Sequence, residues 1–174
     1  MMLINIYVCI LLIENVMPLI YLETKIESNI EICFDLARSI DLHQISTAKS
    51  NERAIGGTMS GLIKLGETVT WEAIHFGIKQ NLTSKITQFK RPFHFRDEEV
   101  KGAFKYIIHD HNFEEINTTV IMKDNFEFQS PLGIIGKLLD KMILIDYMTQ
   151  LLEERNKVIK EYAETEKWKL VLNK

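Results

Sequence analysis

Apolar and polar residues alternate along much of the chain between residues 19 and 128, which is the pattern of β-strands with one buried face. The stretch LIYLETKIE, beginning at Leu19, predicts the first strand. Further strand-like runs occupy residues 93–100, 103–115 and 118–128. Between residues 52 and 89, glycines separate several shorter runs, as they do in antiparallel hairpins. The pattern therefore predicts a large antiparallel sheet.

Helical periodicity occurs near both ends of this strand-rich region. Ser28 and Glu31 match a capping box that opens a short helix over residues 29–39, and a second short helical piece follows at residues 40–45. After QSPLG the apolar spacing changes to that of an amphipathic helix over residues 134–162. This last helix is the longest that the sequence predicts.

A sheet with one apolar face has to bury that face, and only the C-terminal helix is long enough to cover it. The order of elements predicts an α+β fold. About seven antiparallel strands form a curved sheet wrapped around a long C-terminal helix, with two short helices between the first and second strands. No internal repeat or low-complexity linker indicates a second domain.

The same order, with the stretches IYLETKI, CFDLARSIDLH, KLGETVTWEAIHFG, FRDEEVKGAFKYIIHDHNFE and SPLGIIGKLLDKMIL, resembles the START-like or SRPBCC superfamily of helix-grip proteins. It is most similar to small bacterial ligand-binding or cyclase/dehydrase-like members. The resemblance covers residues 18–164 and implies a cavity, between sheet and helix, that holds a hydrophobic small molecule. Relatives bind lipids, quinones, plant hormones or polyketides, and a minority cyclise or dehydrate polyketide chains. Fold alone does not choose among these functions.

We expect one ligand-binding domain at residues 17–165, with an apolar extension before it at residues 1–16 and a tail after it at residues 166–174. The apolar run at residues 6–13 is too short to span a bilayer, follows no Lys or Arg, and precedes no small-residue cleavage site. The sequence therefore predicts no stable membrane insertion.

Composition and charge exclude some partners. A net charge of -3, from 21 basic and 24 acidic residues, provides no basic stripe for a phosphate backbone, which argues against nucleic acid. The two cysteines, Cys9 and Cys33, lie in no metal-ligand or redox spacing, which fits a cytoplasmic location. Nothing in the sequence identifies a protein partner or requires a cofactor.

The stretch IIHDHNF carries the most informative candidate chemistry. Its two histidines are two residues apart on a strand, so His109 and His111 face the same side, and Ile107 and Phe113 make that side the inner one. The same alternation, with the stripe of the long helix, selects the other inward residues. The predicted ligand-binding set is Trp71, His75, Phe95, Asp97, His109, His111, Met122, Asp124, Phe126, Met142 and Met148.

Three interpretations of the inward histidines and carboxylates remain open. They can satisfy one another as a structural network, because buried carboxylates need hydrogen-bond donors. They can instead anchor the polar end of a ligand in an apolar pocket. In an enzyme, His109 and Asp124 would transfer protons as an acid-base pair. A metal site using His109 and His111 with His75 or Asp124 rests on a weakly specific pattern, so the sequence predicts no metal.

We favour a non-enzymatic protein that binds a hydrophobic or amphipathic small molecule such as a lipid, a quinone or a polyketide. One alternative is a polyketide cyclase/dehydratase-like enzyme that uses the same histidines and carboxylates. Another, from a different class, is a protein-interaction module whose cavity is filled by its own side chains.

Overall fold

The computed structural model describes residues 18–129 and 144–172. The strands are β1 (Leu19–Ile26), β2 (Arg53–Gly57), β3 (Thr68–His75), β4 (Ile78–Lys90), β5 (His94–Lys101), β6 (Tyr106–Ile116) and β7 (Thr119–Gln129). The helices are α2 (Ile30–Ala37), α3 (Ile40–Ser46), α5 (Ile145–Ala163) and α6 (Lys169–Leu172), with short 3-10 turns η1 (Ala48–Ser50) and η3 (Glu166–Trp168).

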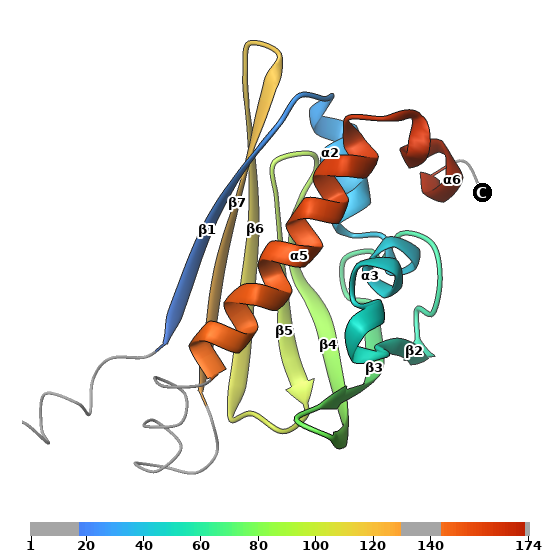
Figure 1. Ribbon diagram of the computed structural model, residues 1–174, viewed down its shortest axis with the longest axis vertical. Coiled ribbons are helices and arrows are strands. Elements are labelled where there is room, and N and C mark those ends of the chain that lie inside the picture. Colours follow the sequence, from blue (N-terminus) through green and yellow to red (C-terminus); the bar gives the residue numbers. More distant parts are fainter. Residues whose placement is uncertain (1–17, 130–143, 173–174) are drawn as a thin grey trace, which may run out of the picture.

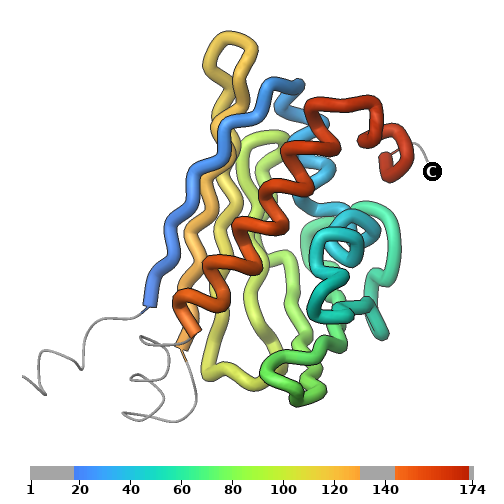
Figure 2. The backbone as a smooth tube through the Cα atoms, in the orientation of Figure 1, coloured from blue at the N-terminus to red at the C-terminus, as the bar shows by residue number. Residues whose placement is uncertain are grey.

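All seven strands form one antiparallel sheet in the order β1-β7-β6-β5-β4-β3-β2. The sheet bends around α5, which crosses its concave side, while α2 and α3 lie beside that helix (Figure 1). The tube in Figure 2 shows the same grip, with β1 running past one side of α5. The predicted α+β helix-grip fold, with two short helices between the first and second strands, is confirmed.

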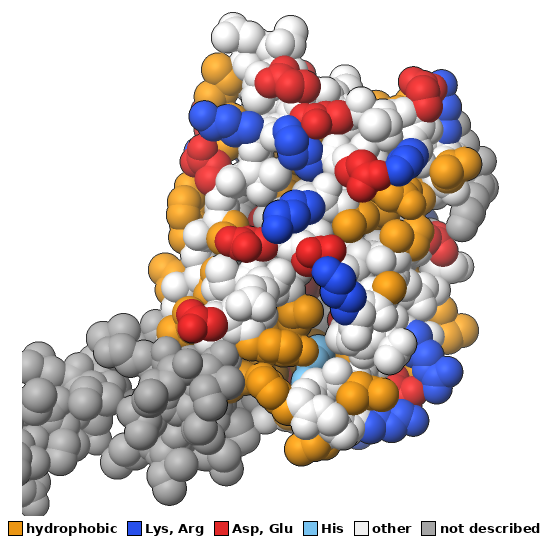
Figure 3. All heavy atoms as spheres, viewed as in Figure 1, with side chains coloured by type: hydrophobic (Ala, Val, Ile, Leu, Met, Phe, Trp, Pro, Cys, Tyr) orange, Lys and Arg blue, Asp and Glu red, His pale blue; other side chains and the backbone are white. Residues whose placement is uncertain are grey.

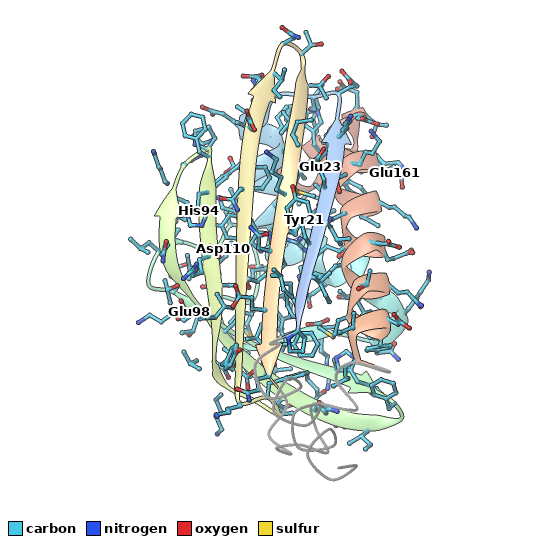
Figure 4. All side chains as sticks on the ribbon, turned by 90° about the vertical axis from the view of Figure 1, so that its left-hand side faces the viewer. Tyr21, Glu23, His94, Glu98, Asp110 and Glu161 are labelled. Atoms are coloured by element: carbon cyan, nitrogen blue, oxygen red, sulfur yellow. The ribbon has the colours of Figure 1, made fainter. Side chains whose placement is uncertain are left out.

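The alternation of side chains along each strand determines which of them lie on the concave face of the sheet, toward α5. In β6, buried residues alternate with partly exposed ones from Ile107 to Phe113, and β7 follows the same pattern from Met122 to Phe128. The opposite, outward face carries polar residues such as His94 and Asp110, which point toward each other across β5 and β6 in Figure 4. The inner face assigned from the sequence is therefore the buried one.

The start of α2 differs from its prediction by one residue. Asn29 is the N-cap, and its side chain accepts a hydrogen bond from the backbone N–H of Glu31. Ser28, the predicted cap, instead donates its hydroxyl to the carbonyl of Ala163 at the end of α5. Both Ser and Asn are good caps, so sequence preference alone does not separate them.

The long helix presents a mixed stripe to the sheet. Its buried residues are Leu152, Arg155, Asn156, Ile159 and Ala163. The predicted start of this helix and the candidate ligand contact Met142 lie outside the described residues. The last part of the predicted tail packs on the domain, because η3 and α6 follow α5 and Val171 is buried in the main core cluster.

That core centres on Phe34 of α2. Its fully buried ring makes edge-to-face contacts with Phe89, Phe95 and Phe113, at centroid distances of 5.3, 5.4 and 5.4 Å. These contacts join the short helix to three consecutive strands. Edge-to-face aromatic pairs add to the stability that area burial alone provides.

Replacing Phe34 by alanine should lower the free energy of unfolding by roughly 3–5 kcal/mol, because it leaves a cavity among three aromatic rings. Phe93→Ala is the matched control, since the Phe93 side chain is 50% exposed and its loss should cost less than about 0.5 kcal/mol. Urea unfolding followed by far-UV circular dichroism measures both. Equal losses in the two variants would contradict this description of the core.

Candidate functional site

A cavity of about 430 Å³ lies between the concave side of the sheet and the helices α3 and α5. Figure 3 shows a hollow beside the lower half of α5, with hydrophobic side chains at its rim and a histidine in view. Eight of the predicted ligand-binding residues line the cavity: Trp71, His75, Phe95, Asp97, His109, His111, Phe126 and Met148.

Two predicted contacts do not reach the cavity. Met122 is fully buried in the core cluster around Phe34, and Asp124 is fully buried behind the two histidines of β6. Both lie on the inner face, as predicted, but the alternation of a strand gives only the face and not the depth. Met142 lies outside the described residues.

The strand register gathers four polar side chains into one cluster, which we call the His-Asp cluster: Asp97, His109, His111 and Asp124. Asp97 on β5 is paired with His109 on β6, and His111 on β6 is paired with Asp124 on β7. Directly paired residues on one face have neighbouring side chains. The cluster therefore crosses three adjacent strands on the inner face.

Asp124 is the deepest group of the His-Asp cluster. Its Oδ1 lies 3.0 Å from Nε2 of His109 and 2.8 Å from Nδ1 of His111, although the second contact is off the hydrogen-bond direction. From α5, the Asn156 amide donates to Oδ2 over 2.7 Å, and a guanidinium nitrogen of Arg155 lies 3.7 Å from Oδ1. The buried carboxylate thus has partners from strand and helix.

The environment sets the charge state of these groups. Burial by itself would raise the pKa of Asp124, but the contacts with His109 and His111 hold it well below its usual range. Burial, reinforced by neighbouring His111, lowers the pKa of His109 to about 4. At neutral pH, Asp124 is therefore an anion and His109 a neutral imidazole that donates from Nε2.

Asp97 closes the His-Asp cluster on the cavity side. Its side chain is 26% exposed where it faces the cavity, and its Oδ2 has no hydrogen-bond partner among the described residues. That oxygen lies 3.9 Å from Nδ1 of His109 and 3.8 Å from Nε2 of His111. The three atoms lie within 4.8 Å of one another and could hold a metal ion. They could equally bind the polar end of a ligand.

Two further polar pairs line the cavity. His75 Nδ1 lies 2.7 Å from the hydroxyl of Tyr147, so this histidine contacts α5 rather than the His-Asp cluster. His43 stacks on Trp71 with a centroid distance of 4.2 Å, and its Nε2 lies 3.2 Å from Oε1 of Glu52. The pKa of Glu52 is lowered because interaction with His43 outweighs the effect of burial.

Sequence reasoning missed Tyr147, His43 and Glu52. Tyr147 is one position before Met148 on α5, so the helical stripe that selected Met148 could have included it. His43 lies in the last turn of α3, and Glu52 lies in the connection between η1 and β2. A residue in an irregular connection has no period that would indicate its direction.

Solved structures share this fold at low sequence identity, whereas no protein-family model and no curated protein sequence matches the chain. A protein of Thermus thermophilus has a TM-score of 0.64 at 14% identity, over 82% of this chain and 97% of its own. The major latex-like protein 151 of Panax ginseng has a TM-score of 0.63 at 15% identity, over 85% and 98%. A Chromobacterium violaceum protein has a TM-score of 0.63 at 9% identity, over 84% and 97%.

These likenesses extend over nearly the whole length of the compared proteins, so the chain has the complete helix-grip fold that they share. Within residues 18–129 and 144–172, no helix has both the length and the apolar character needed to cross a bilayer.

Replacing Asn156 by aspartate tests the anion inside the site. The change removes a donor to Asp124 and adds a second buried carboxylate, so the free energy of unfolding should fall by about 3 kcal/mol or more at pH 7. Because one proton can be shared by two facing carboxylates, part of that loss should be recovered at pH 5. The unmodified chain should show the opposite slope and lose stability between pH 7 and pH 5, because burial lowers the folded-state pKa of His109 from 6.5 to about 4.

Thermal melting at both pH values measures this difference. Asn112→Asp is the control, because Asn112 lies on the outer face, paired with His94 and Lys123, and a carboxylate there lies beside the Lys123 ammonium and solvent. If Asn156→Asp and Asn112→Asp had the same effect, Asp124 would not be a buried anion.

Proposed function

We propose that this protein binds one hydrophobic or amphipathic small molecule in the cavity between its sheet and α5. The observation that supports the proposal is the cavity itself, about 430 Å³ in volume, with a mainly apolar wall interrupted by a few converging polar groups. Small-molecule sites in proteins have this size and composition. The likeness to START-like proteins supports the same class of ligand: a lipid, a quinone or a polyketide.

The lining suggests how such a ligand would lie. Trp71, Phe126 and Met148 offer apolar surface, and Phe95 stacks on His111 with a centroid distance of 4.2 Å. The polar end of the ligand would meet the His-Asp cluster. At that end, Oδ2 of Asp97 has no hydrogen-bond partner among the described residues, and a turn of this partly exposed side chain would let it accept a hydrogen bond from a ligand hydroxyl.

An enzymatic role is the second candidate, and one observation favours it. His109 lines the cavity while its other ring nitrogen is hydrogen-bonded to the buried Asp124, 3.0 Å away, which is how a base is oriented for proton transfer. Mass analysis of the bound molecule before and after incubation separates the candidates. An unchanged mass together with an unchanged chromatographic retention supports binding alone. A loss of water supports a dehydratase, and a changed retention at the same mass supports a cyclase, because ring closure without dehydration conserves every atom.

The third alternative, an interaction module, required a cavity filled by the protein's own side chains. Large side chains such as Trp71 and Phe126 line the cavity of about 430 Å³, which supports the binding proposal over this alternative. We therefore do not propose it.

The two tryptophans allow a direct test of ligand binding. Trp71 lines the cavity, whereas Trp168 packs on the core from η3 and does not line it. In metal-free Trp168→Phe protein, a naphthoquinone or a medium-chain fatty acid should change the fluorescence of Trp71 saturably. In Trp71→Phe protein, the same probe should leave the fluorescence of Trp168 unchanged.

A cavity-filling variant provides the second arm of this test. Ala73 is buried in the cavity wall on β3, so Ala73→Trp should weaken binding by roughly tenfold or more, which is about 1.4 kcal/mol. Ala48→Trp is the control, because Ala48 is exposed in η1. Equal responses from Trp71 and Trp168, or equal affinity in Ala73→Trp and Ala48→Trp, would contradict binding in the cavity.

A further inference from the structure

Three atoms around Asp97 have an arrangement that hydrogen bonding does not explain. Oδ2 of Asp97 lies 3.9 Å from Nδ1 of His109 and 3.8 Å from Nε2 of His111, and it accepts no hydrogen bond from any described residue. A proton shared between a ring nitrogen and this oxygen would bring the two atoms to about 2.8 Å. Both gaps are too long for such a bond.

The tautomer of His109 makes the gap more unusual. Its Nε2 donates to Asp124, so in the neutral ring Nδ1 carries a lone pair. On His111, Nδ1 lies 2.8 Å from Asp124 but makes no hydrogen bond there, and Nε2 lies 3.8 Å from Oδ2 of Asp97. Two ring nitrogens and one carboxylate oxygen thus lie within 4.8 Å of one another. The lone pair of His109 Nδ1 and the Asp97 carboxylate repel each other unless a cation lies between them.

The spacing is close to that of a transition-metal site. Ligand bonds of about 2.0–2.2 Å place two ligand atoms of one ion roughly 3.0–3.5 Å apart. The two gaps to Asp97, of 3.8 and 3.9 Å, would have to close by a few tenths of an ångström, and all three atoms lie within 4.8 Å of one another. The rings of His109 and His111 already lie side by side, with centroids 3.7 Å apart. Rotation of the partly exposed Asp97 side chain can supply that adjustment.

The groups behind the rings are those that metal sites use to orient their histidines. Ligating histidines commonly present the other ring nitrogen to a carboxylate, which fixes the tautomer and makes the ligand more basic. Asp124 takes this position for His109, with a hydrogen bond of 3.0 Å, and it also lies 2.8 Å from Nδ1 of His111. The Asn156 amide donates to Asp124 over 2.7 Å. Asp124 and Asn156 are therefore already in place behind the three candidate ligand atoms of Asp97, His109 and His111.

Charge also favours a cation. Asp97 and Asp124 are two carboxylates, and Arg155 is the one guanidinium that contacts the His-Asp cluster among the described residues, 3.7 Å from Asp124. A nitrogen of Arg155 also donates to the carbonyl of Ala37, so part of its hydrogen-bonding capacity is used elsewhere. Two carboxylates thus face one guanidinium that is partly engaged elsewhere, and a divalent ion would complement their charge.

We propose that Asp97, His109 and His111 form a binding site for a divalent transition metal in the wall of the cavity. Two imidazoles and one carboxylate suit zinc or iron(II), and they leave the coordination positions on the cavity side open. An oxygen atom of a bound small molecule could take one of these positions. The ion would bind whether or not the cavity holds an organic ligand, so the proposal goes beyond the proposed function.

Metal titration of the full chain, without an affinity tag and after dialysis against a chelator, tests this site. Zinc is followed by calorimetry and cobalt(II) by its visible absorption. We expect one ion per chain. Asp97→Asn, which keeps the shape of the side chain, should weaken binding by about a hundredfold or more, because loss of an outer partner alone costs roughly 10–100-fold.

Asp110→Asn is the matched control. Asp110 and His94 lie on the outer faces of β6 and β5, with 2.7 Å between their nearest polar atoms, so they form a surface pair of the same residue types. This variant should bind the ion as the unmodified chain does. Absence of stoichiometric binding, equal loss in both variants, or no loss in Asp97→Asn would overturn the proposal.

The melting temperature provides a second test of the metal site that does not depend on the binding assay. Zinc should raise the melting temperature of the unmodified chain and of Asp110→Asn, but not that of Asp97→Asn, because only a native state that binds the ion gains stability from it. If Asp97→Asn does not fold, His111→Gln replaces it. The fluorescence test of the cavity uses metal-free protein, so a failed metal site would leave the proposed function standing, and the reverse also holds.

Discussion

The structure depends on keeping one carboxylate charged where no water reaches it. Asp124 is fully buried, and an isolated carboxylate in such a place would cost many kcal/mol. Its contacts come from His109 and His111 on β6 and from Asn156 on α5. A shift of β6 by one residue would turn both imidazoles outward, and a rotation of α5 would withdraw the amide. Strand register and helix orientation are thus tied to the same anion.

Patterns with a strict period predicted most of the fold and one face of the site. The alternation in β6 and β7 identified His109, His111 and Asp124 as inward residues, and the change of period after residue 129 indicated the long helix. Alternation predicts the face of the sheet on which a side chain lies, but not how deeply that side chain is buried. Asp124 and Asp97 lie on the same face of one sheet, yet the first is sealed behind imidazoles and the second faces the cavity.

The remaining parts of the site arise from contacts between elements, which no local pattern encodes. The pairing of Asp97 with His109 depends on the register between β5 and β6, which a β-bulge or a change of loop length would alter. For that reason the sequence suggested His75 or Asp124 as a companion to the two histidines, whereas the structure places Asp97 there and turns His75 toward Tyr147. Glu52 enters from a connection with no period at all.

The contacts within the His-Asp cluster and the contacts that α5 makes with the sheet span very different separations along the chain. His109 and Asp124 are 15 residues apart on adjacent strands, whereas Asn156 reaches back 132 residues to touch Thr24 of β1. Contacts close in sequence form quickly, and distant ones carry a larger entropic cost of loop closure. The hairpin that holds the anion can therefore assemble while it is still hydrated. The Asn156 amide and the Arg155 guanidinium approach Asp124 only when α5 packs on the sheet, so the removal of water from this carboxylate is coupled to the docking of the helix.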